Sequence, residues 1–295
     1  MSPNASHIVQ TMQTTHFAVI GNPVKHSRSP SIHRLFAQQT GISLEYEWLE
    51  APIDQFESTV GHFFSQGGSG LNVTVPFKQL AWRLACEHLS PRAKLAQAVN
   101  TLWMQNNSLH GCNTDGVGLV SDLLRLGVAC KGARILLIGA GGAARGVMGP
   151  LLETGCAQLK IVNRTEARAR ELLDAWQEAY PDSGQQISTG GLADAQQPGG
   201  WDVVINASAS SLGDTAPQVP EGLYATGALA YDMMYSALPT PFMRQAQADG
   251  AQTTSDGLGM LVGQAAESFY LWHGVRPDVT PVLHAIRTEL DASIT

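Results

Sequence analysis

A glycine-rich turn between an apolar run and a helical segment is the sequence feature that most constrains the fold of this chain. Residues 135–138 predict a short buried strand, and the next six residues fit the pattern G-x-G-x-x-A before a helical run begins: Gly139, Ala140, Gly141, Gly142, Ala143 and Ala144. The first glycine permits a tight turn, the second lets the backbone approach a pyrophosphate, and the final alanine allows close packing of the helix. The helix N-terminus then faces the phosphates. The segment predicts a dinucleotide-binding unit, and the alternative is a turn that is merely rich in glycine.

Short apolar runs alternate with helical segments along most of the chain. Six of these runs predict buried strands, at residues 17–20, 71–75, 135–138, 159–162, 203–205 and 229–231. This alternation predicts an α/β protein with mostly parallel sheets. A helical run that ends at Gly127 precedes the second series of strands, and one long helix is expected from Leu258 to just before Gly274.

We therefore expect a two-domain α/β architecture. Residues 1–15 form a polar N-terminal tail, and residues 16–117 together with 255–295 form an α/β substrate-binding and catalytic domain with a mostly parallel sheet. Residues 118–254 form a nucleotide-binding domain inserted between these two parts.

Composition excludes several classes of protein. With 295 residues, 44% of them hydrophobic and 15% charged, the chain can bury a large core. A net charge of −7 gives no general attraction for nucleic acid or an anionic membrane, so neither is expected as a partner. The four cysteines show no C-x-x-C pairing and no histidine at metal-ligand spacing, so neither a metal site nor a disulfide framework is expected. The first fifteen residues lack a basic start and an apolar region, and no apolar run reaches the ~18 residues of a membrane span, which favours a cytoplasmic protein.

The residues after the second strand of the nucleotide unit bear on which dinucleotide binds. An NAD-binding unit usually carries Asp or Glu there, but this chain has Asn163, Arg164 and Thr165, followed by Arg168. Thr165 is expected to cap the next helix, which places Arg168 in its first turn, where a cation is mildly unfavourable unless an anion binds. Two arginines near the expected 2′-phosphate favour NADP. The alternative is a solvated Arg168 compensated by Glu166.

Two serines precede the first predicted helix. Pro30 disfavours helical geometry at Ser29, and in an extended stretch the hydroxyls of Ser27 and Ser29 face the same way. Pro30 also suits the first position of a helix, so both hydroxyls would lie beside a helix N-terminus, where a carboxylate can bind. The alternative, equally favoured by this segment alone, is that Ser29 only caps the helix.

Polar residues also interrupt a predicted buried strand. Alternation places Asn72 and Thr74 on one face of residues 71–75, and buried polar groups need partners. Considered alone, Lys78 after the strand is more simply an exposed lysine, and Asp115 before a helix is more simply a cap.

Taken together, eight segments resemble the NADP-dependent shikimate dehydrogenase family. They are GNPVKHSRSP, NVTVPFK, AVNTL, NTDGVG, GAGGAARG, NRT, YDMMY and DGLGMLVGQA, and they follow the family's order from Gly21 to about Pro277. The resemblance implies an oxidoreductase of the shikimate pathway of aromatic amino acid biosynthesis, which acts on a CH–OH group and interconverts 3-dehydroshikimate and shikimate with NADP(H). It also implies a Rossmann-type fold for the cofactor domain. The chain departs from the family at Ala144, where some relatives have Ser.

The resemblance also implies roles for individual residues. The implied catalytic pair is Lys78 and Asp115, which would also contact the substrate. The implied substrate-binding residues are Ser27, Ser29 and Tyr235 at the substrate carboxylate, and Asn72, Thr74, Asn100 and Gln264 at the ring hydroxyls or carbonyl. The implied cofactor-binding residues are the six of the glycine-rich turn, Asn163, Arg164, Thr165 and Arg168 at the 2′-phosphate, and Met233 and Gly257 near the nicotinamide.

In this interpretation Lys78 donates a proton to the carbonyl oxygen on which negative charge grows, and no metal is required. His26 and His33 are not expected to act as acid or base, because a lone histidine near a turn is usually structural or solvated. The reverse reaction needs Lys78 as a base; burial would favour the neutral amine and Asp115 the charged one, and the sequence leaves this balance open.

Two rival functions fit the same motifs. One is a quinate or quinate/shikimate dehydrogenase, which commonly prefers NAD; Arg164 and Arg168 argue against it. The other is a non-catalytic NADP-binding regulator, against which the intact Lys78 and Asp115 argue. The sequence leaves a monomer and a homodimer equally open.

Overall fold

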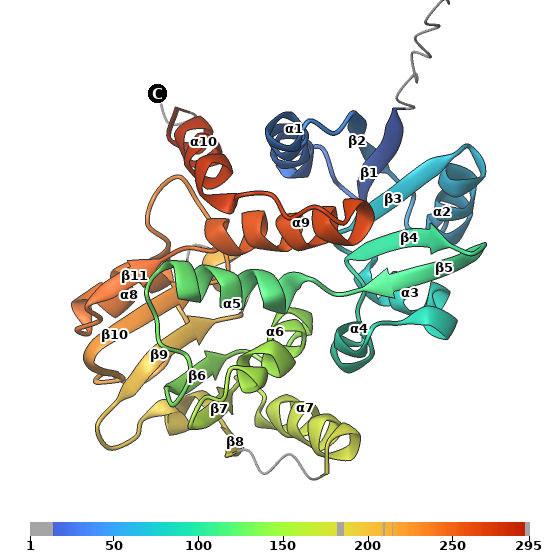
Figure 1. Ribbon diagram of the computed structural model, residues 1–295. Helices are drawn as coiled ribbons and strands as arrows, with labels where there is room; N and C mark the ends of the chain where they lie inside the picture. Colours follow the sequence, from blue (N-terminus) through green and yellow to red (C-terminus); the bar gives the residue numbers. More distant parts are fainter. Residues whose placement is uncertain (1–13, 182–185, 209, 214, 293–295) are drawn as a thin grey trace, which may run out of the picture.

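Two β-sheets with helices on both faces form the described part of the chain, which comprises residues 14–181, 186–208, 210–213 and 215–292 of a computed structural model (Figure 1). The strand orders are β2-β1-β3-β4-β5 in the first sheet and β11-β10-β9-β6-β7-β8 in the second. The predicted α/β class is therefore confirmed. Of the predicted polar tail, residues 1–13 lie outside the described ranges, and Thr15 already opens the first strand.

The first sheet combines three parallel strands with an antiparallel hairpin. Its strands are β1 (Thr15–Gly21), β2 (Leu44–Glu50), β3 (Gly68–Val73), β4 (Thr101–Gln105) and β5 (Ser108–Cys112). β1 pairs in parallel with β2 and β3, whereas β4 runs antiparallel to both β3 and β5. Asn106 and Asn107 join β4 to β5 with φ values of 51° and 61°, the conformation that a two-residue hairpin turn requires.

The predicted strand at residues 71–75 begins three residues too late and ends two residues too late. β3 ends at Val73, and Val75 is 61% exposed rather than buried. The ladder cannot continue past this point because Pro76 has no N–H to donate. The predicted alternation therefore holds for Asn72 and Val73, both buried, and fails at Val75.

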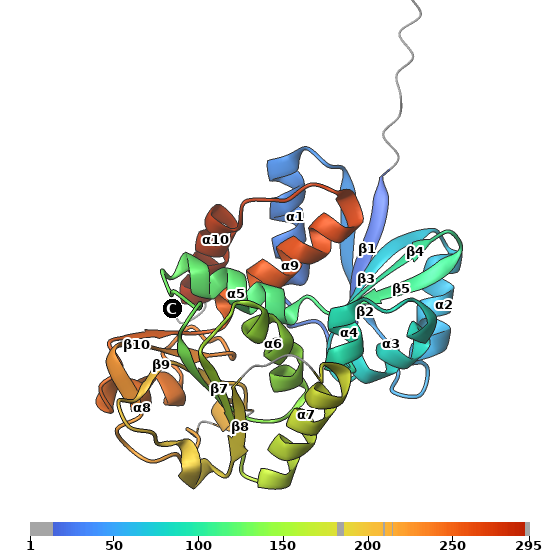
Figure 2. The same ribbon diagram turned by 60° about the horizontal axis from the view of Figure 1, so that its bottom comes forward.

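Helices cover both faces of the first sheet, and each face has its own apolar core. The helices are α1 (Ser29–Thr40), α2 (Phe56–Ser65), α3 (Lys78–Leu84), the 3₁₀ helix η1 (Cys86–His88), α4 (Pro91–Ala96), α9 (Leu258–His273) and α10 (Val279–Ala292). One core joins α2 and α3 to β1 and β3. The other joins α1 to α9 and α10, so the C-terminal part of the chain completes this sheet's second layer (Figure 2).

The second sheet is parallel throughout. Its strands are β6 (Arg134–Ile138), β7 (Gln158–Val162), β8 (Ile187–Gly190), β9 (Trp201–Asn206), β10 (Tyr224–Asp232) and β11 (Thr253–Ser255). The helices that follow its strands are α6 (Gly142–Glu153), α7 (Glu166–Ala179), α8 (Pro241–Ala248) and the 3₁₀ helices η2 (Leu192–Ala195) and η3 (Ser210–Gly213). The chain runs from β6 outward to β8 and then crosses back to β9 on the other side of β6. A sheet with this order binds ligands where the direction reverses, which here is the end of β6.

Two helices run between the sheets and touch backbone to backbone. α5 (Asp115–Arg125) leaves the first sheet, α9 returns to it, and the two lie side by side in both views (Figures 1 and 2). A Cβ atom added at Gly118 would lie 2.6 Å from the Gln264 backbone nitrogen and 2.7 Å from the Met260 carbonyl oxygen. Gly263 faces Gly118 from the other side, so the absence of side chains permits this close crossing.

We predict that Gly118→Ala lowers the free energy of unfolding by about 1–3 kcal/mol. The added methyl group would overlap backbone atoms of α9, so α5 and α9 would have to move apart. Gly61→Ala is the matched control, since this helical glycine in α2 has open space around its Cα, and alanine there should stabilise by up to ~1 kcal/mol. Urea unfolding of the two variants measures both effects. Equal stabilities would contradict the close crossing.

Candidate active site

The polar residues singled out in the sequence lie at one edge of the first sheet. Asn72 at the end of β3 pairs with Thr101 at the start of β4, and Thr101 pairs with Cys112 at the end of β5. Lys78 follows β3 at the start of α3, and Asp115 follows β5 at the start of α5. Strand ends that meet at one edge bring together residues that are far apart in the chain.

Lys78 and Asp115 form an ion pair with 2.7 Å between Nζ and Oδ2. Asp115 is only 8% exposed, and its other oxygen accepts a hydrogen bond of 2.8 Å from the Asn100 side chain. Considered alone, Lys78 was more simply interpreted as an exposed lysine and Asp115 as a helix cap. The structure contradicts both interpretations. The carboxylate binds two side-chain donors from other segments, and α5 has no side-chain cap.

Six buried side chains, which we call the polar cluster, adjoin this ion pair. They are Asn72, Asn100, Thr101, Thr114, Gln264 and Ser268. Asn100 and Thr114 each donate to the Gln264 side-chain oxygen at 3.3 Å, and Asn72 donates to Ser268 at 3.0 Å. Gln264 and Ser268 come from α9, so this helix closes the cluster that the sheet edge begins.

The serine pair lies at the start of α1. The Ser27 and Ser29 hydroxyls are 3.2 Å apart, which confirms that they converge. The expected backbone was wrong, because Ser29 is already the first residue of the helix and Pro30 the second. The capping alternative is also excluded, since Arg28 is the N-cap residue and no side chain caps the helix.

The charge of Arg28, the residue between Ser27 and Ser29, acts on Tyr235. Burial raises the pKa of the Tyr235 phenol, and the positive charge of Arg28 opposes the rise. The Arg28 guanidinium also lies 3.7 Å from a carboxylate oxygen of Glu289, so its charge acts on both residues. Thr74 lies beyond the end of β3, where its methyl group packs beside Gly21.

The glycine-rich turn has the conformation that its sequence predicts. Gly139 has a φ of +116°, and a Cβ there would lie 3.0 Å from the Ala207 carbonyl group. Ala144 is fully buried in the core beneath α6, where the final small residue of the motif was expected to pack.

The N-terminus of α6 leaves room for a phosphate group. No atom lies within 4 Å of a Cβ built at Gly141 or Gly142, and Gly142 is the first residue of the helix. Open space at a helix N-terminus is what a pyrophosphate needs. Ala140 is buried and Ala143 exposed at the same turn.

The residues predicted near a 2′-phosphate lie at the end of β7 and the start of α7. Asn163 donates to the Thr165 carbonyl oxygen at 2.8 Å, which shapes the turn. Thr165 occupies the N-cap position but makes no side-chain cap, so that part of the expectation was wrong. Arg164 and Arg168 are exposed, and neither forms an ion pair within the described ranges, so Glu166 does not compensate Arg168.

Met233 and Gly257 are neighbours between β10 and α9. The Gly257 amide donates to the Met234 carbonyl oxygen at 3.0 Å, and a Cβ at Gly257 would collide with the Met233 carbonyl group. Both segments follow strands of the second sheet, β10 and β11, at its carboxyl edge.

The ion pair and the glycine-rich turn lie close together. A Cβ built at Gly146, one turn into α6, would lie 3.7 Å from Cβ of Asp115. Pro150, one turn further along α6, touches Gly116 in the same way. The predicted catalytic pair therefore faces the first turns of the helix that begins at the glycine-rich turn.

Several residues of the site were not predicted from the sequence. Thr101, Thr114 and Ser268 belong to the polar cluster, and Tyr46 on β2 donates to the Asn72 side-chain oxygen at 2.7 Å. The repeated Asn-Thr pairs at residues 100–101 and 113–114 were the available signal. Tyr46 carried none, because only the strand pairing brings it near Asn72.

His33 is completely buried, and burial lowers its pKa from 6.5 to about 3. It is therefore neutral at physiological pH, and no exposed face is available for proton exchange with a ligand. The expectation that His33 is not an acid or base agrees with this environment. Its Nε2 atom lies 3.1 Å from Oδ1 of Asn72.

We predict that His33 makes folding stability depend on pH. The unfolded chain binds a proton at His33 below pH 6.5 while the folded chain does not until about pH 3, so stability falls as pH drops through this window. Between pH 7 and 5 the loss from His33 is on the order of 2 kcal/mol, separate from a smaller effect of His273, whose pKa burial also lowers. Urea unfolding at both pH values measures it. In His33→Gln the dependence should be weaker by that amount, and an unchanged dependence would contradict the assignment.

The described ranges contain no group of three or more His, Cys, Asp or Glu side chains that could hold a metal ion. None of the helices that they include is long and apolar enough to cross a membrane.

Three models of protein families match most of the chain. Residues 19–102 match the shikimate dehydrogenase substrate binding domain, residues 123–211 the shikimate/quinate 5-dehydrogenase family, and residues 257–287 the shikimate 5′-dehydrogenase C-terminal domain.

Similar proteins cover nearly the same length. A shikimate dehydrogenase (NADP⁺) of Bordetella avium is 65% identical over 274 residues, which are 93% of this chain and 95% of that protein. An Ael1 enzyme from Pseudomonas putida is 40% identical with a TM-score of 0.86, over 92% of this chain and 98% of that one. Shikimate 5-dehydrogenase of Thermus thermophilus, solved in complex with NADP(H) and shikimate, is 32% identical with a TM-score of 0.81, over 93% of this chain and 99% of that one.

Proposed function

Because this chain belongs to the shikimate dehydrogenase family, we propose that it catalyses the reversible NADPH-dependent reduction of 3-dehydroshikimate to shikimate. The observation that carries the proposal is the Lys78–Asp115 ion pair at 2.7 Å, part-buried beside the helix that follows the glycine-rich turn. This step belongs to the shikimate pathway of aromatic amino acid biosynthesis.

Lys78 is the proton donor in this proposal. NADPH, when bound, supplies the hydride. As negative charge grows on the ring oxygen, a positioned ammonium group stabilises it and then transfers a proton. Asp115 holds the lysine side chain in place, and Asn100 holds Asp115 through its second oxygen, so the donor is already oriented before substrate binds.

The remaining site residues divide between two parts of the substrate. Ser27, Ser29 and Tyr235 bind the carboxylate, for which the charge of Arg28 provides a favourable environment. Asn72, Thr74, Asn100 and Gln264 hold the ring hydroxyls and carbonyl. Convergence of the polar cluster on Asp115 supports this division.

The cofactor residues fit a dinucleotide with a 2′-phosphate. The open space at Gly141 and Gly142 suits the pyrophosphate, and the exposed guanidinium groups of Arg164 and Arg168, which form no ion pair with the described residues, suit the extra phosphate. Asn163 and Thr165 shape the turn that carries Arg164. Met233 and Gly257 adjoin the nicotinamide.

The proposed domains follow the sheets. Residues 16–117 with 255–295 form the substrate-binding and catalytic domain, and residues 118–254 form the NADP domain. This division is supported by the strands, since β1–β5 come from residues 15–112 and β6–β11 from residues 134–255. We propose that the enzyme acts in the cytoplasm as a monomer or a homodimer, which sedimentation analysis distinguishes.

The test of this function is consumption of NADPH with 3-dehydroshikimate, followed by absorbance. We predict that Lys78→Ala lowers kcat by about 10²-fold or more, with a smaller change in KM, because the variant loses an interaction that is strongest in the transition state. The exposed Lys131→Ala is the control and should keep wild-type kinetics. Near-normal turnover of Lys78→Ala would remove Lys78 from the chemistry, and an inactive wild-type protein would favour a non-catalytic regulator.

Cofactor choice is tested at Arg168. We predict that Arg168→Ala raises KM for NADPH by about 10-fold or more and leaves KM for NADH unchanged, because only NADPH carries the phosphate that this arginine would bind. Arg170→Ala, also exposed on α7, is the matched control. A wild-type enzyme that prefers NADH and quinate would instead support the quinate dehydrogenase alternative.

A further inference from the structure

The side chain of Asn72 is the buried junction of the first sheet's polar edge. Its amide nitrogen has three neighbours: the Asn100 carbonyl oxygen at 3.1 Å, the Thr101 hydroxyl at 3.3 Å and the Ser268 hydroxyl at 3.0 Å. Its oxygen has two, Nε2 of His33 at 3.1 Å and the Tyr46 hydroxyl at 2.7 Å. Every polar atom of this amide is therefore engaged within the protein.

These partners fix which way the amide points. The Asn100 carbonyl oxygen can only accept, so the atom beside it must be the Asn72 nitrogen. The Ser268 hydroxyl also donates to the Gln264 carbonyl oxygen at 3.0 Å, which leaves it as an acceptor toward Asn72. The Asn72 oxygen must then face His33 and Tyr46, and both of these must donate to it.

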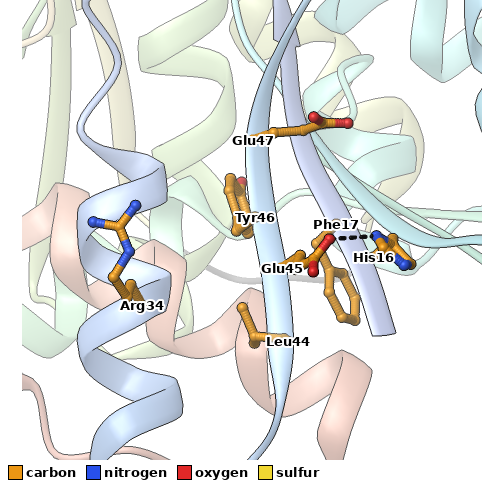
Figure 3. Close-up of a pocket in the computed structure, with 7 residues that line it drawn as sticks. All are labelled: His16, Phe17, Arg34, Leu44, Glu45, Tyr46 and Glu47. Carbon is orange, nitrogen blue, oxygen red and sulfur yellow. Dashed lines mark ion pairs between the residues drawn. The ribbon is translucent and has the colours of Figure 1, made fainter. Parts of the chain in front are cut away.

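His33 and Tyr46 pack against each other while both bind the Asn72 oxygen. Their rings stack with centroids 4.4 Å apart and planes 10° from parallel. Donation to Asn72 requires the proton of His33 on Nε2, and Nδ1 has no partner, in agreement with a neutral ring. Figure 3 shows the Tyr46 side chain between its strand, β2, and α1, the helix that carries His33.

The same helix carries part of the proposed carboxylate site. Ser29 and His33 are four residues apart on α1, so they lie on one face of the helix, and both are buried. A hydrogen bond with Ser29 opposes part of the burial-driven rise in the pKa of Tyr46. Ser29 thus shares a helix face with His33, and His33 both stacks on Tyr46 and lies 3.1 Å from Oδ1 of Asn72.

We propose that His33 and Tyr46 are positioning residues that lock the Asn72 amide and couple the carboxylate site at Ser27 and Ser29 to the polar cluster around Asp115. Neither residue needs to touch the substrate. Binding of the substrate carboxylate and orientation of the Asn72 amide then depend on each other. Ring compounds without a carboxylate would therefore bind less well. The inference rests on the proposed function, because it assigns the serine pair to the carboxylate.

The first test is Tyr46→Phe, which removes the donor and keeps the stacked ring. We expect KM for shikimate to rise about 3- to 10-fold, the effect of losing one neutral hydrogen bond, with KM for NADP⁺ unchanged. Tyr180→Phe is the matched control, since Tyr180 stacks on Trp176 at the end of α7. A merely destabilised protein would lose active enzyme without this selective change in KM. Wild-type KM for shikimate in Tyr46→Phe would overturn the proposal, whereas an inactive wild type would instead refute the proposed function.

The second test addresses coupling. Ser29→Ala and Tyr46→Phe are measured singly and together, and the combined loss in kcat/KM should be at least about 3-fold smaller than the product of the single losses. Independent effects, whose product equals the combined loss, would overturn the coupling. His33→Gln, which can still donate to Asn72, should retain a lower KM for shikimate than His33→Leu, which cannot. Equal KM values in these two variants would overturn the role of His33.

Discussion

The close crossing of α5 and α9 at Gly118 and Gly263 sets the positions of most groups in the site. α5 begins with Asp115 and follows Thr114, while α9 carries Gln264 and Ser268. These side chains meet within 3.3 Å only because two helix backbones lie in contact. The same two helices join the sheets, so the geometry of the ion pair and the relative placement of the sheets depend on one contact between glycines.

A second constraint comes from the order of strands in the parallel sheet. β6 and β9 lie side by side although two strands separate them in the chain, and the turn after β6 therefore opens where the chain direction reverses. Gly139 packs closely against Ala207 across this point, where a Cβ on Gly139 would lie 3.0 Å from the Ala207 carbonyl group. Further along α6, Gly146 and Pro150 adjoin Asp115 and Gly116, so the proposed phosphate site and the proposed proton donor lie at one end of the same helix contact.

Much of this arrangement was predictable from local sequence, but not all of it. The buried strands of the parallel sheet, the turn at Gly139 and the long helix ending before Gly274 follow from apolar periodicity and glycine placement, which are local properties. The hairpin β4–β5 was not predicted, because its strands mix polar and apolar residues and belong to a sheet with both parallel and antiparallel pairs. The end of the strand at 71–75 was predicted two residues too late, because apolar character continued to Val75, whose neighbour Pro76 cannot join the ladder.

Lys78, Asp115, Asn72, Asn100 and Gln264 lie together at the sheet edge, while several buried residues that support them were missed. Nothing in the sequence around Tyr46 distinguishes it from other half-buried strand residues. Its contact with Asn72 arises from the register of β1 with both β2 and β3, a long-range property. His33 was not expected to act as an acid or base, and its hydrogen bond to Asn72 depends on tertiary packing that periodicity does not encode.

Arg164 and Arg168 also bear on the turnover of the protein in the cell. Cations at the start of α7 oppose the helix dipole and remain uncompensated within the described ranges until an anion arrives. A ligand that binds only the folded chain stabilises it by RT ln(1 + [L]/Kd), about 2.7 kcal/mol at a hundredfold excess over Kd. Cells rich in phosphorylated dinucleotide would thus protect this chain from proteolysis as well as supply its reductant, so that its abundance follows the cofactor pool.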